Sequence, residues 1–374
     1  MLTTEELKRY NRHIILSEIG KEGQEKLKNA KVLVVGAGGL GCPVLSYLTA
    51  AGVGTLGIVD FDRIDESNLQ RQVLYTSDDV GKYKAATAAE KLTRQNPFTR
   101  FNVHLERLSP DNILDIFVHY DIVVDGTDNF PTRYLVNDAC VMLGKALVFG
   151  SIFRFEGQVS VFNYMIEGRR GPTYRCLFPE PPAPGEVPNC SQIGVLGVLP
   201  GVIGTLQANE TLKIILGVGE VLSGKMLIAD LLGANFHVIS FQANEENFHI
   251  KGFMDYEAFC GFPKEEKEVG GSLSPEELKV LLDEGQDIVL LDVREDFERE
   301  ICRLDGLHIP MNRIPACVDV LPRDKKLVVY CHYGMRSASV INYLSSSHGF
   351  GNLYNLEGGI DAWAEEVEPE MERY

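Results

Sequence analysis

The chain has 374 residues and a formal net charge of −17, with 45% hydrophobic and 24% charged residues. Such an acidic surplus argues against a surface that binds nucleic acid as its main function. The hydrophobic and charged fractions are ordinary for a globular protein, and the length predicts about two or three domains.

The chain shows no predicted targeting or membrane-spanning segment. Residues 1–9 are charged and typical of a helix, unlike a secretory signal. The longest apolar run, residues 193–206, contains four glycines and a proline and is too short to cross a bilayer. The eight cysteines are scattered, unlike those of a disulfide scaffold. We therefore expect a cytoplasmic protein with no membrane partner.

Predicted strands alternate with helices in the first part of the chain. The strands are expected at residues 31–36, 55–60, 120–125 and 146–150. This alternation predicts an α/β fold with a doubly wound, mostly parallel sheet.

The turn after the first predicted strand is rich in glycine. Gly36, Gly38 and Gly41 match the pattern Gly-x-Gly-x-x-Gly, which places phosphates at the N-terminus of the next helix. Asp60 lies 19 residues after Gly41, close to the offset of an acid that binds a ribose. The pattern alone leaves three interpretations open: a tight turn without ligand, a nicotinamide enzyme, or an enzyme that uses ATP.

A polar set farther along the chain favours ATP over NAD. Its members are Asn68, Arg71, Gln72, Lys84 and Asp128. Hydride transfer needs no extra cations around the phosphates, whereas attack of a carboxylate on an α-phosphorus brings two anions together. Arg71 and Lys84 can neutralise that charge, and Asp128 can hold a Mg²⁺ ion that bridges the phosphates.

A charged stretch that ends in glycines separates this region from a second one. Residues 264–271 show no apolar periodicity and form the best linker candidate. After them, Ser274 and Pro275 begin a helix with an N-cap serine and a proline at the first helical position. We therefore expect a first domain at residues 1–262, a linker at 263–272 and a smaller α/β domain at 273–374.

A cysteine loop is the main feature of the second region. Cys331 follows a predicted strand at residues 326–330 and precedes a predicted helix at 337–344. Loop N–H groups and the helix N-terminus favour an anion there, so the thiolate is the expected working species. Four residues separate Cys331 from Arg336, which is the length of a rhodanese loop and suits a persulfide better than a phosphate. The alternative is a buried cysteine that only packs.

Specific motifs in the first region resemble the MoeB/ThiF family of ubiquitin-activating-type adenylyltransferases. They lie at residues 9–12, 36–42, 60–62, 67–72 and 127–129, and the resemblance extends to about Phe262. The second region resembles a rhodanese at residues 290–295 and in the Cys331 loop. The combination resembles the fused adenylyltransferase–sulfurtransferase proteins that make sulfur-carrier thiocarboxylates.

The resemblance implies roles for individual residues. Asp60 would bind the ribose of ATP, Asp128 would bind Mg²⁺, and Arg12 would reach the ATP of the partner subunit in a homodimer. Phosphates and the transition state would be contacted by Asn68, Arg71, Gln72 and Lys84, with Gly36, Gly38, Gly39, Gly41 and Asp62 completing the nucleotide site. Cys331 and Arg336 would serve sulfur transfer, and the co-substrate would be a small ubiquitin-like sulfur carrier ending in Gly-Gly.

Cys190 is a second candidate for sulfur chemistry. The proline-rich stretch 179–188 before it predicts a long loop without regular structure. The resembled family places a sulfur-handling cysteine on this loop, and Cys190 matches that position. The alternative is an incidental thiol.

The chain departs from the resembled family at its structural zinc site. Two Cys-x-x-Cys pairs hold zinc in that family, but here Thr173 and Glu257 stand where the first cysteine of each pair would be. Cys176 and Cys260 remain, and two thiolates with a hydroxyl and a carboxylate make a poor zinc site. We expect no tightly bound zinc. Local packing is the expected substitute, with a Cys176–Cys260 disulfide as the alternative.

These observations predict an ATP-dependent and Mg²⁺-dependent enzyme. It would adenylate the C-terminal glycine of a sulfur carrier and replace AMP with sulfur from a Cys331 persulfide, which a persulfide or thiosulfate donor loads. The alternative function is a sulfurtransferase whose nucleotide-binding domain regulates it without adenylating anything.

Overall fold

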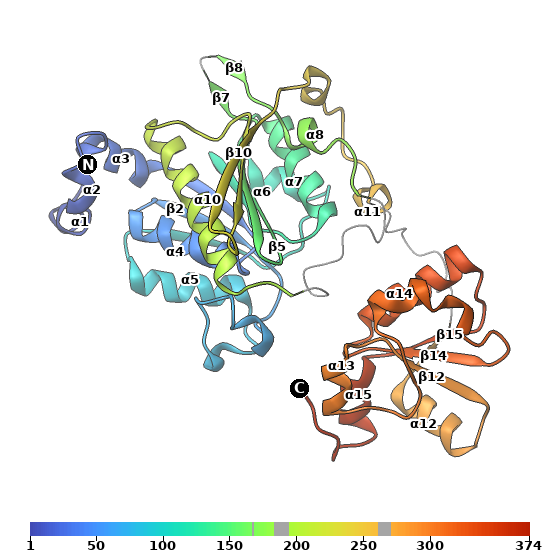
Figure 1. The fold of residues 1–374 in the computed structure, drawn as a ribbon. Helices are drawn as coiled ribbons and strands as arrows, with labels where there is room; N and C mark the ends of the chain where they lie inside the picture. Colours follow the sequence, from blue (N-terminus) through green and yellow to red (C-terminus); the bar gives the residue numbers. More distant parts are fainter. Residues whose placement is uncertain (167, 183–193, 261–270) are drawn as a thin grey trace. The chain divides into compact units, whose positions relative to one another are not determined.

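The computed structural model describes residues 1–166, 168–182, 194–260 and 271–374. The chain divides into two compact units, Met1–Phe262 and Pro263–Tyr374 (Figure 1). Within the described ranges, none of the helices combines the length and apolar character that a membrane span requires.

An eight-stranded sheet forms the centre of the first unit, in the order β10-β9-β6-β5-β4-β1-β2-β3. Strands β1 to β5 pair in parallel, and β6, β9 and β10 extend the sheet in antiparallel fashion. The strands are β1 (Lys31–Val35), β2 (Thr55–Val59), β3 (Arg100–His104), β4 (Ile122–Asp125), β5 (Ala146–Phe153), β6 (Glu156–Phe162), β9 (Lys225–Asp230) and β10 (Asn235–Ser240), with β7 (Met165–Ile166) and β8 (Arg169–Arg170) as a separate pair. The predicted doubly wound, mostly parallel sheet is confirmed.

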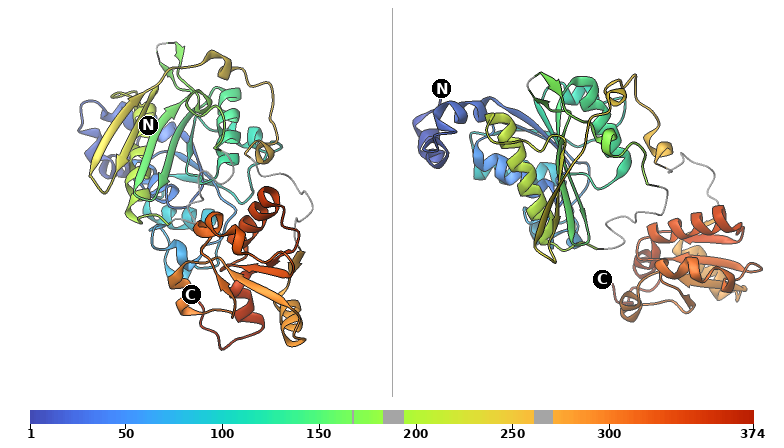
Figure 2. Two further views of the ribbon diagram at one scale, coloured as in Figure 1. Left: turned by 45° about the vertical axis from the view of Figure 1, so that its right-hand side comes forward. Right: turned by 45° about the horizontal axis from the view of Figure 1, so that its top comes forward.

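Helices cover both faces of this sheet (Figure 2). They are α1 (Thr4–Arg9), α2 (Asn11–Ile14), α3 (Gly20–Asn29), α4 (Gly41–Ala51), α5 (Lys84–Gln95), α6 (Ile113–Phe117), α7 (Phe130–Leu143), α8 (Tyr174–Leu177), α10 (Val198–Leu216) and α11 (Tyr256–Phe259), with short 3₁₀ helices η1 (Glu66–Asn68), η2 (Ser77–Asp79) and η3 (Glu245–Phe248). Along β1, Val32 and Val34 belong to the core that α4, α5 and α10 share, whereas Leu33 and Val35 belong to the core with α6 and α7. Burial on both faces explains the unbroken apolar run of this strand.

The second unit is a parallel sheet of five strands in the order β11-β15-β14-β12-β13. Its strands are β11 (Gly271–Leu273), β12 (Ile288–Asp292), β13 (Leu307–His308), β14 (Lys326–Tyr330) and β15 (Leu353–Leu356); its helices are α12 (Pro275–Asp283), α13 (Asp296–Ile301), α14 (Met335–His348) and α15 (Gly359–Glu366), with η4 (Met311–Ala316) and η5 (Val318–Val320). Leu327 and Val329 of β14 pack in the core that includes α14. Val328 and Tyr330 pack on the other face with Trp363 of α15.

The expected linker differs from the structure at its C-terminal end. Gly271 and Ser272 belong to β11, which pairs in parallel with Tyr354 and Asn355 of β15. Glycine and serine have low strand propensity, so local composition did not indicate this strand. Pairing with β15, far along the chain, forms it. Residues 263–270 of the expected linker lie outside the described residues.

Candidate active sites

Two positions in the glycine turn between β1 and α4 have no room for a side chain. Gly36 has a φ of +92°, and a Cβ there would lie 2.9 Å from the carbonyl oxygen of Gly126. A Cβ on Gly41 would lie 2.0 Å from the carbonyl oxygen of Gly36. Both positions therefore require glycine, and the turn leads directly into the N-terminus of α4, the end of a helix that favours an anion.

Two predicted polar residues lie beside this turn. A Cβ on Gly38 would be 3.5 Å from Nε2 of Gln72, and one on Gly39 would be 3.7 Å from Cγ of Arg71. Gln72 is buried, and its Oε1 has no hydrogen-bond partner among the described residues. An unpartnered buried acceptor is costly unless a ligand donates to it. The structure therefore brings Arg71 and Gln72 together with the predicted phosphate site.

Asp60 ties the end of β2 to the same turn. Its Oδ2 accepts a hydrogen bond of 2.8 Å from the backbone N–H of Ala37, and its Oδ1 accepts one of 2.9 Å from the backbone N–H of Asp62. Burial raises the pKa of Asp60, against these stabilising hydrogen bonds. The carboxylate is held in one orientation, as an acid that positions a ribose must be.

Lys84 brings a positive charge to this region. It begins α5, is buried, and donates from Nζ to Oδ2 of Asp62 at 2.9 Å. Arg71 donates from Nη1 to the carbonyl oxygen of Ser67 at 3.0 Å, and Asn68 donates from Nδ2 to Oγ of Ser67 at 3.4 Å. The loop after β2 therefore orients several members of the predicted set.

The loop after β4 presents Asp128. Asp125 accepts hydrogen bonds of 2.9 and 2.7 Å from the backbone N–H and Oγ1 of Thr127, which fixes the turn, and the next residue, Asp128, is exposed. Among the described residues, no group of three or more His, Cys, Asp or Glu side chains could hold a metal ion. Asp128 still fits Mg²⁺, which protein sites often bind through one or two carboxylates plus substrate phosphates.

Sequence reasoning missed three residues at this end of the sheet. Buried Asp125 has a pKa raised by burial, and its Oδ2 has no partner among the described residues. Arg133 donates to the carbonyl oxygen of Thr127 at 3.1 Å, and Gln207 donates to that of Asp125 at 2.6 Å. The acid at the end of a buried strand was a usable signal for Asp125. Gln207 is 82 residues from its partner, so no local pattern indicated it.

Two predicted residues are not placed in a site by the structure. Arg12 is exposed on α2, and the described residues include no hydrogen bond or ion pair between it and the nucleotide set. Its role toward a partner subunit stays a prediction. Cys190 lies outside the described residues, so its role also stays a prediction.

The remaining cysteines of the degraded zinc site are free thiols that pack locally. Cys176 Sγ accepts hydrogen bonds from the backbone N–H of Thr173 at 3.4 Å and of Asn244 at 3.3 Å. Cys260 is buried in an apolar core, where burial raises its pKa to about 11. Glu257 pairs instead with Arg107 at 2.7 Å. Local packing, rather than a disulfide, is therefore what joins this region.

In the second unit, Cys331 lies directly after β14 and is buried. Its Sγ accepts a hydrogen bond of 3.1 Å from the backbone N–H of Gly334 and lies 3.5 Å from Oγ of Ser337. Gly334 has a φ of +87°, a conformation that favours glycine. The loop therefore directs donors at the sulfur, as a persulfide anion requires.

The N-terminus of α15 closes the loop from the other side. Ile360 N–H donates to the carbonyl oxygen of Cys331 at 2.9 Å, and Asp361 N–H donates to that of His332 at 3.1 Å. Gly359 has a φ of +65°, and a Cβ there would lie 2.2 Å from the carbonyl oxygen of His332. Glycine at 359 therefore lets α15 hold the loop by its backbone.

Arg336 is paired within the wall of the site. Its Nη1 and Nη2 donate to Oε2 and Oε1 of Glu298 at 2.7 and 2.5 Å. Burial alone would raise the pKa of Glu298, but hydrogen bonds from Arg336 and the backbone of Glu295 lower it to about 2. Sequence reasoning missed Glu298, which is 38 residues from Arg336.

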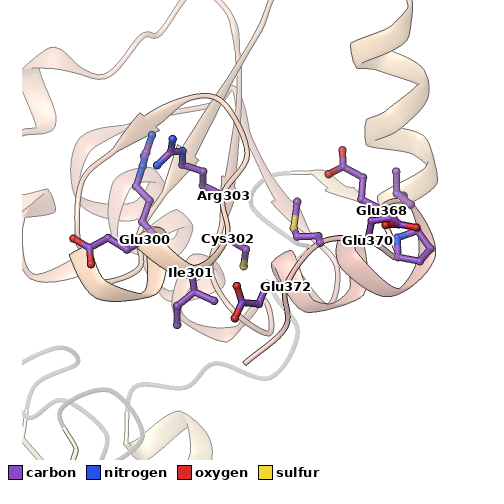
Figure 3. A pocket seen from close by; sticks show the side chains of 11 residues that line it. Glu300, Ile301, Cys302, Arg303, Glu368, Glu370 and Glu372 are labelled. Carbon is purple, nitrogen blue, oxygen red and sulfur yellow. The ribbon is translucent and has the colours of Figure 1, made fainter.

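Tyr374 completes this network. Its hydroxyl donates to Oε1 of Glu298 at 2.9 Å and accepts from Nη1 of Arg294 at 2.9 Å, while its ring stacks on His332 with centroids 4.2 Å apart. The segment 367–372 that leads to it lines a cavity of about 720 Å³ whose opposite wall is residues 299–303 (Figure 3). Sequence reasoning also missed Tyr374, because no sequence motif connects this residue with the Cys331 loop.

Two known families match this chain, one in each unit. The ThiF family matches residues 10–250, and the rhodanese-like domain matches residues 274–366. The chain belongs to the ThiF family. The predicted combination of a MoeB/ThiF-type domain with a C-terminal rhodanese domain is thereby confirmed.

Two relatives of this ThiF-family chain match its whole length, and a third matches about two thirds of it. It is 45% identical over 379 residues to the probable adenylyltransferase/sulfurtransferase MoeZ of Mycobacterium tuberculosis, covering 100% of this chain and 96% of the relative. It is 39% identical over 407 residues to the adenylyltransferase and sulfurtransferase MOCS3 of Xenopus laevis, covering 100% and 89%. A sulfur carrier protein adenylyltransferase of Thermus thermophilus is 54% identical over 266 residues, covering 69% of this chain and 98% of that one.

Solved structures share the fold of the first unit at low identity. MccB of E. coli with ATP is 24% identical with a TM-score of 0.51, covering 59% of this chain and 66% of that one. This likeness supports the ThiF fold and nothing about the substrate.

Proposed function

We propose that this protein adenylates the C-terminal glycine of a small ubiquitin-like sulfur carrier with ATP, and then converts it to a thiocarboxylate with sulfur carried on Cys331. The observation that carries the proposal is the presence of two sites in one chain. A glycine turn lies beside Lys84 and Arg71, and a thiol loop directs donors at a buried sulfur. The names of the relatives that cover the whole chain support the same pair of activities.

In the first step, the N-terminus of α4 would bind the phosphates of ATP, and Asp60 would bind its ribose. The carrier carboxylate attacks the α-phosphorus, the bond to the pyrophosphate oxygen breaks, and pyrophosphate leaves with the electron pair. Lys84 and Arg71 offset the charge that builds on the phosphate. Mg²⁺ held by Asp128 would supply further charge neutralisation on the phosphates.

In the second step, the Cys331 thiolate accepts a sulfane sulfur from a donor and becomes a persulfide. The Gly334 N–H and the Ser337 hydroxyl lie where they can stabilise its negative charge. The persulfide attacks the carrier carbonyl and AMP leaves, which joins carrier and Cys331 through a disulfide. A thiolate, which we assign to Cys190, then attacks the Cys331 sulfur of this disulfide. A Cys190–Cys331 disulfide forms, and the thiocarboxylate leaves with the electron pair of the broken S–S bond. A thiol reductant must then reduce the Cys190–Cys331 disulfide before the next cycle.

A homodimer is the proposed assembly. All six residues of β10, at the edge of the sheet, are exposed, and they include Phe236, Val238 and Ile239. An exposed apolar edge strand is a liability that natural proteins usually cover. A partner subunit at this edge would cover it. In the proposed dimer Arg12 acts in the partner's nucleotide site, as the family resemblance implies.

The experiment that tests the proposal combines the protein with ATP, Mg²⁺ and carriers that end in Gly-Gly. We expect carrier-dependent exchange of pyrophosphate into ATP, and a carrier mass that shows one oxygen replaced by sulfur when a sulfur donor is added. Arg71→Ala should reduce exchange, and Cys331→Ala should abolish sulfur transfer alone. ATP binding without exchange would contradict the proposal and support a regulatory nucleotide domain.

A further inference from the structure

Glu298 neutralises the cation that the Cys331 loop carries. The bidentate pair between Glu298 and Arg336 leaves the two side chains 6% and 20% exposed. A bidentate pair of this kind uses two of the five N–H donors of the guanidinium and balances its charge. An anion that enters the loop therefore meets a cation that already has a counter-ion.

Glu298 is also held in place from its other sides. Its Oε2 accepts a 2.9 Å hydrogen bond from the backbone N–H of Glu295, and its Oε1 accepts one of 2.9 Å from the Tyr374 hydroxyl. Arg294 in turn donates to that hydroxyl at 2.9 Å. Because the carboxylate is buried, turning away from Arg336 would leave a buried charge without its cation. The pair is thus a fixed part of the loop wall.

Three arginines around the loop are each paired with a carboxylate. The cations and their partners are Arg294 with Asp292, Arg336 with Glu298, and Arg373 with Asp361. Burial lowers the pKa of His332, which favours its neutral ring at neutral pH. The described surroundings of Cys331 therefore offer little net positive charge to a small anion.

The following inference rests on the proposed sulfurtransferase function and deepens it. We propose that Glu298 is a specificity-determining residue that masks Arg336, and so weakens binding of small, free anionic sulfur donors such as thiosulfate. With thiosulfate, the Cys331 thiolate attacks the outer sulfur. A new S–S bond forms while the old one breaks, and sulfite leaves with the electron pair. A donor that binds mainly through contacts outside the loop keeps its affinity, because that binding does not depend on the charge of Arg336.

The test measures sulfur transfer from thiosulfate to cyanide by the full chain, with thiosulfate varied. Glu298→Gln keeps the side-chain shape and removes the charge. We expect its KM for thiosulfate to fall roughly three- to tenfold, the size of one charge interaction at a partly exposed site, with kcat changed less than about twofold. Glu300→Gln makes the same exchange at an exposed position of the same helix, and its KM should not change.

Arg336→Gln completes a double-mutant cycle. In the wild-type background it leaves ionised Glu298 without its cation, so the KM for thiosulfate should rise roughly three- to tenfold through repulsion of the anion. In the Glu298→Gln background it should restore the wild-type KM. The double variant decides the question alone if Glu298→Gln does not fold, because its KM should equal that of the wild type only if Glu298 already balances the charge of Arg336.

Two outcomes would contradict the proposed role of Glu298. One is an unchanged or raised KM in folded Glu298→Gln. The other is a KM raised tenfold or more in the Glu298→Gln/Arg336→Gln double variant, which would mean that Arg336 already binds the donor in the wild type. Failure of the sulfurtransferase function itself is distinguished by mass. Wild-type protein treated with excess thiosulfate should gain the mass of one sulfur atom, and Cys331→Ala should not. If the wild type does not gain this mass, the proposed sulfurtransferase function is wrong, and the role of Glu298 is not what failed.

Discussion

Lys84 and Asp62 form an ion pair of 2.9 Å between Nζ and Oδ2, with the Lys84 side chain 9% exposed and that of Asp62 53% exposed. The buried partner is the cation. Its position at the start of α5 is therefore set before any nucleotide arrives, and the exposed carboxylate can move aside when phosphates compete for the ammonium group.

Replacing Lys84 should impair adenylation severely. Lys84→Met removes the charge and keeps much of the volume. We expect carrier-dependent pyrophosphate exchange to fall at least about a hundredfold, as when one preorganised donor to a developing anion is lost. Lys82→Met is the control, since Lys82 pairs with Asp79 in the same stretch and its side chain is 57% exposed. Equal losses in the two variants would contradict the assignment.

Adding a side chain to Gly359 should damage sulfur transfer. Gly359→Ala would place a Cβ 2.2 Å from the carbonyl oxygen of His332 and displace the loop. Gly349→Ala has nearly the same φ, +66°, with nothing within 4 Å, so it carries only the backbone strain of about 1 kcal/mol. We expect a loss of sulfur transfer of more than about tenfold for Gly359→Ala alone. Similar kinetics and calorimetric stability in the two variants would show that the contact does not matter.

The pKa of Glu298 predicts an acid-sensitive second unit. Its folded value of about 2 lies below the ordinary value of 4.5, so ionised Glu298 stabilises the fold above pH 4.5 and that contribution is lost as the pH falls through 2. Glu298→Gln should make the free energy of unfolding fall less steeply between pH 4.5 and pH 2. Acid unfolding followed by near-ultraviolet circular dichroism would measure it. An unaltered acid profile would contradict the pairing with Arg336.

The thiols of the first unit should differ in reactivity. Burial would raise the pKa of Cys176, but hydrogen bonds from Thr173 and Asn244 outweigh it and lower the pKa. Burial raises that of Cys42 to about 12 and that of Cys140 well above its ordinary value. Because the thiolate is the nucleophile, iodoacetamide should label Cys176 before the other two in native protein, as peptide mass mapping would show. Equal labelling rates would refute this order.

The exposed edge strand makes the proposed homodimer testable. Val238→Asp places a charge on β10 and should shift the sedimentation of the protein toward the monomer. Val280→Asp makes the same change on α12, where the valine is 53% exposed compared with 52% for Val238. That control should leave the assembly intact. A Val238→Asp protein that stays dimeric would place the interface elsewhere.

Local patterns predicted the features that depend on short stretches of chain. The glycine turn, Asp60 and Asp128 each follow a buried strand, and the ends of parallel strands meet at one edge of a sheet. The same logic placed Cys331 between β14 and α14. These predictions needed only periodicity and the chemistry of the next few residues.

The residues that tertiary contacts bring together could not be predicted in this way. Glu298 lies 38 residues from Arg336 and 76 from Tyr374, and no sequence motif marks it. Gly359 is required only because α15 packs its first turn against the loop backbone. Strand β11 exists because β15 offers it a free edge. Each of these depends on packing between distant segments, which no local pattern records.

Trp363 is the single tryptophan of the chain, and it is buried in the core of the second unit between β14 and α15. Its fluorescence therefore reports on that unit and is silent on the other, whereas calorimetry detects both. The tryptophan fluorescence of the intact protein therefore monitors the second unit without an added fluorophore. A fluorescence melting curve gives the stability of that domain alone, and one unfolding free energy for the whole chain would not be a defined quantity if the two cores melt separately.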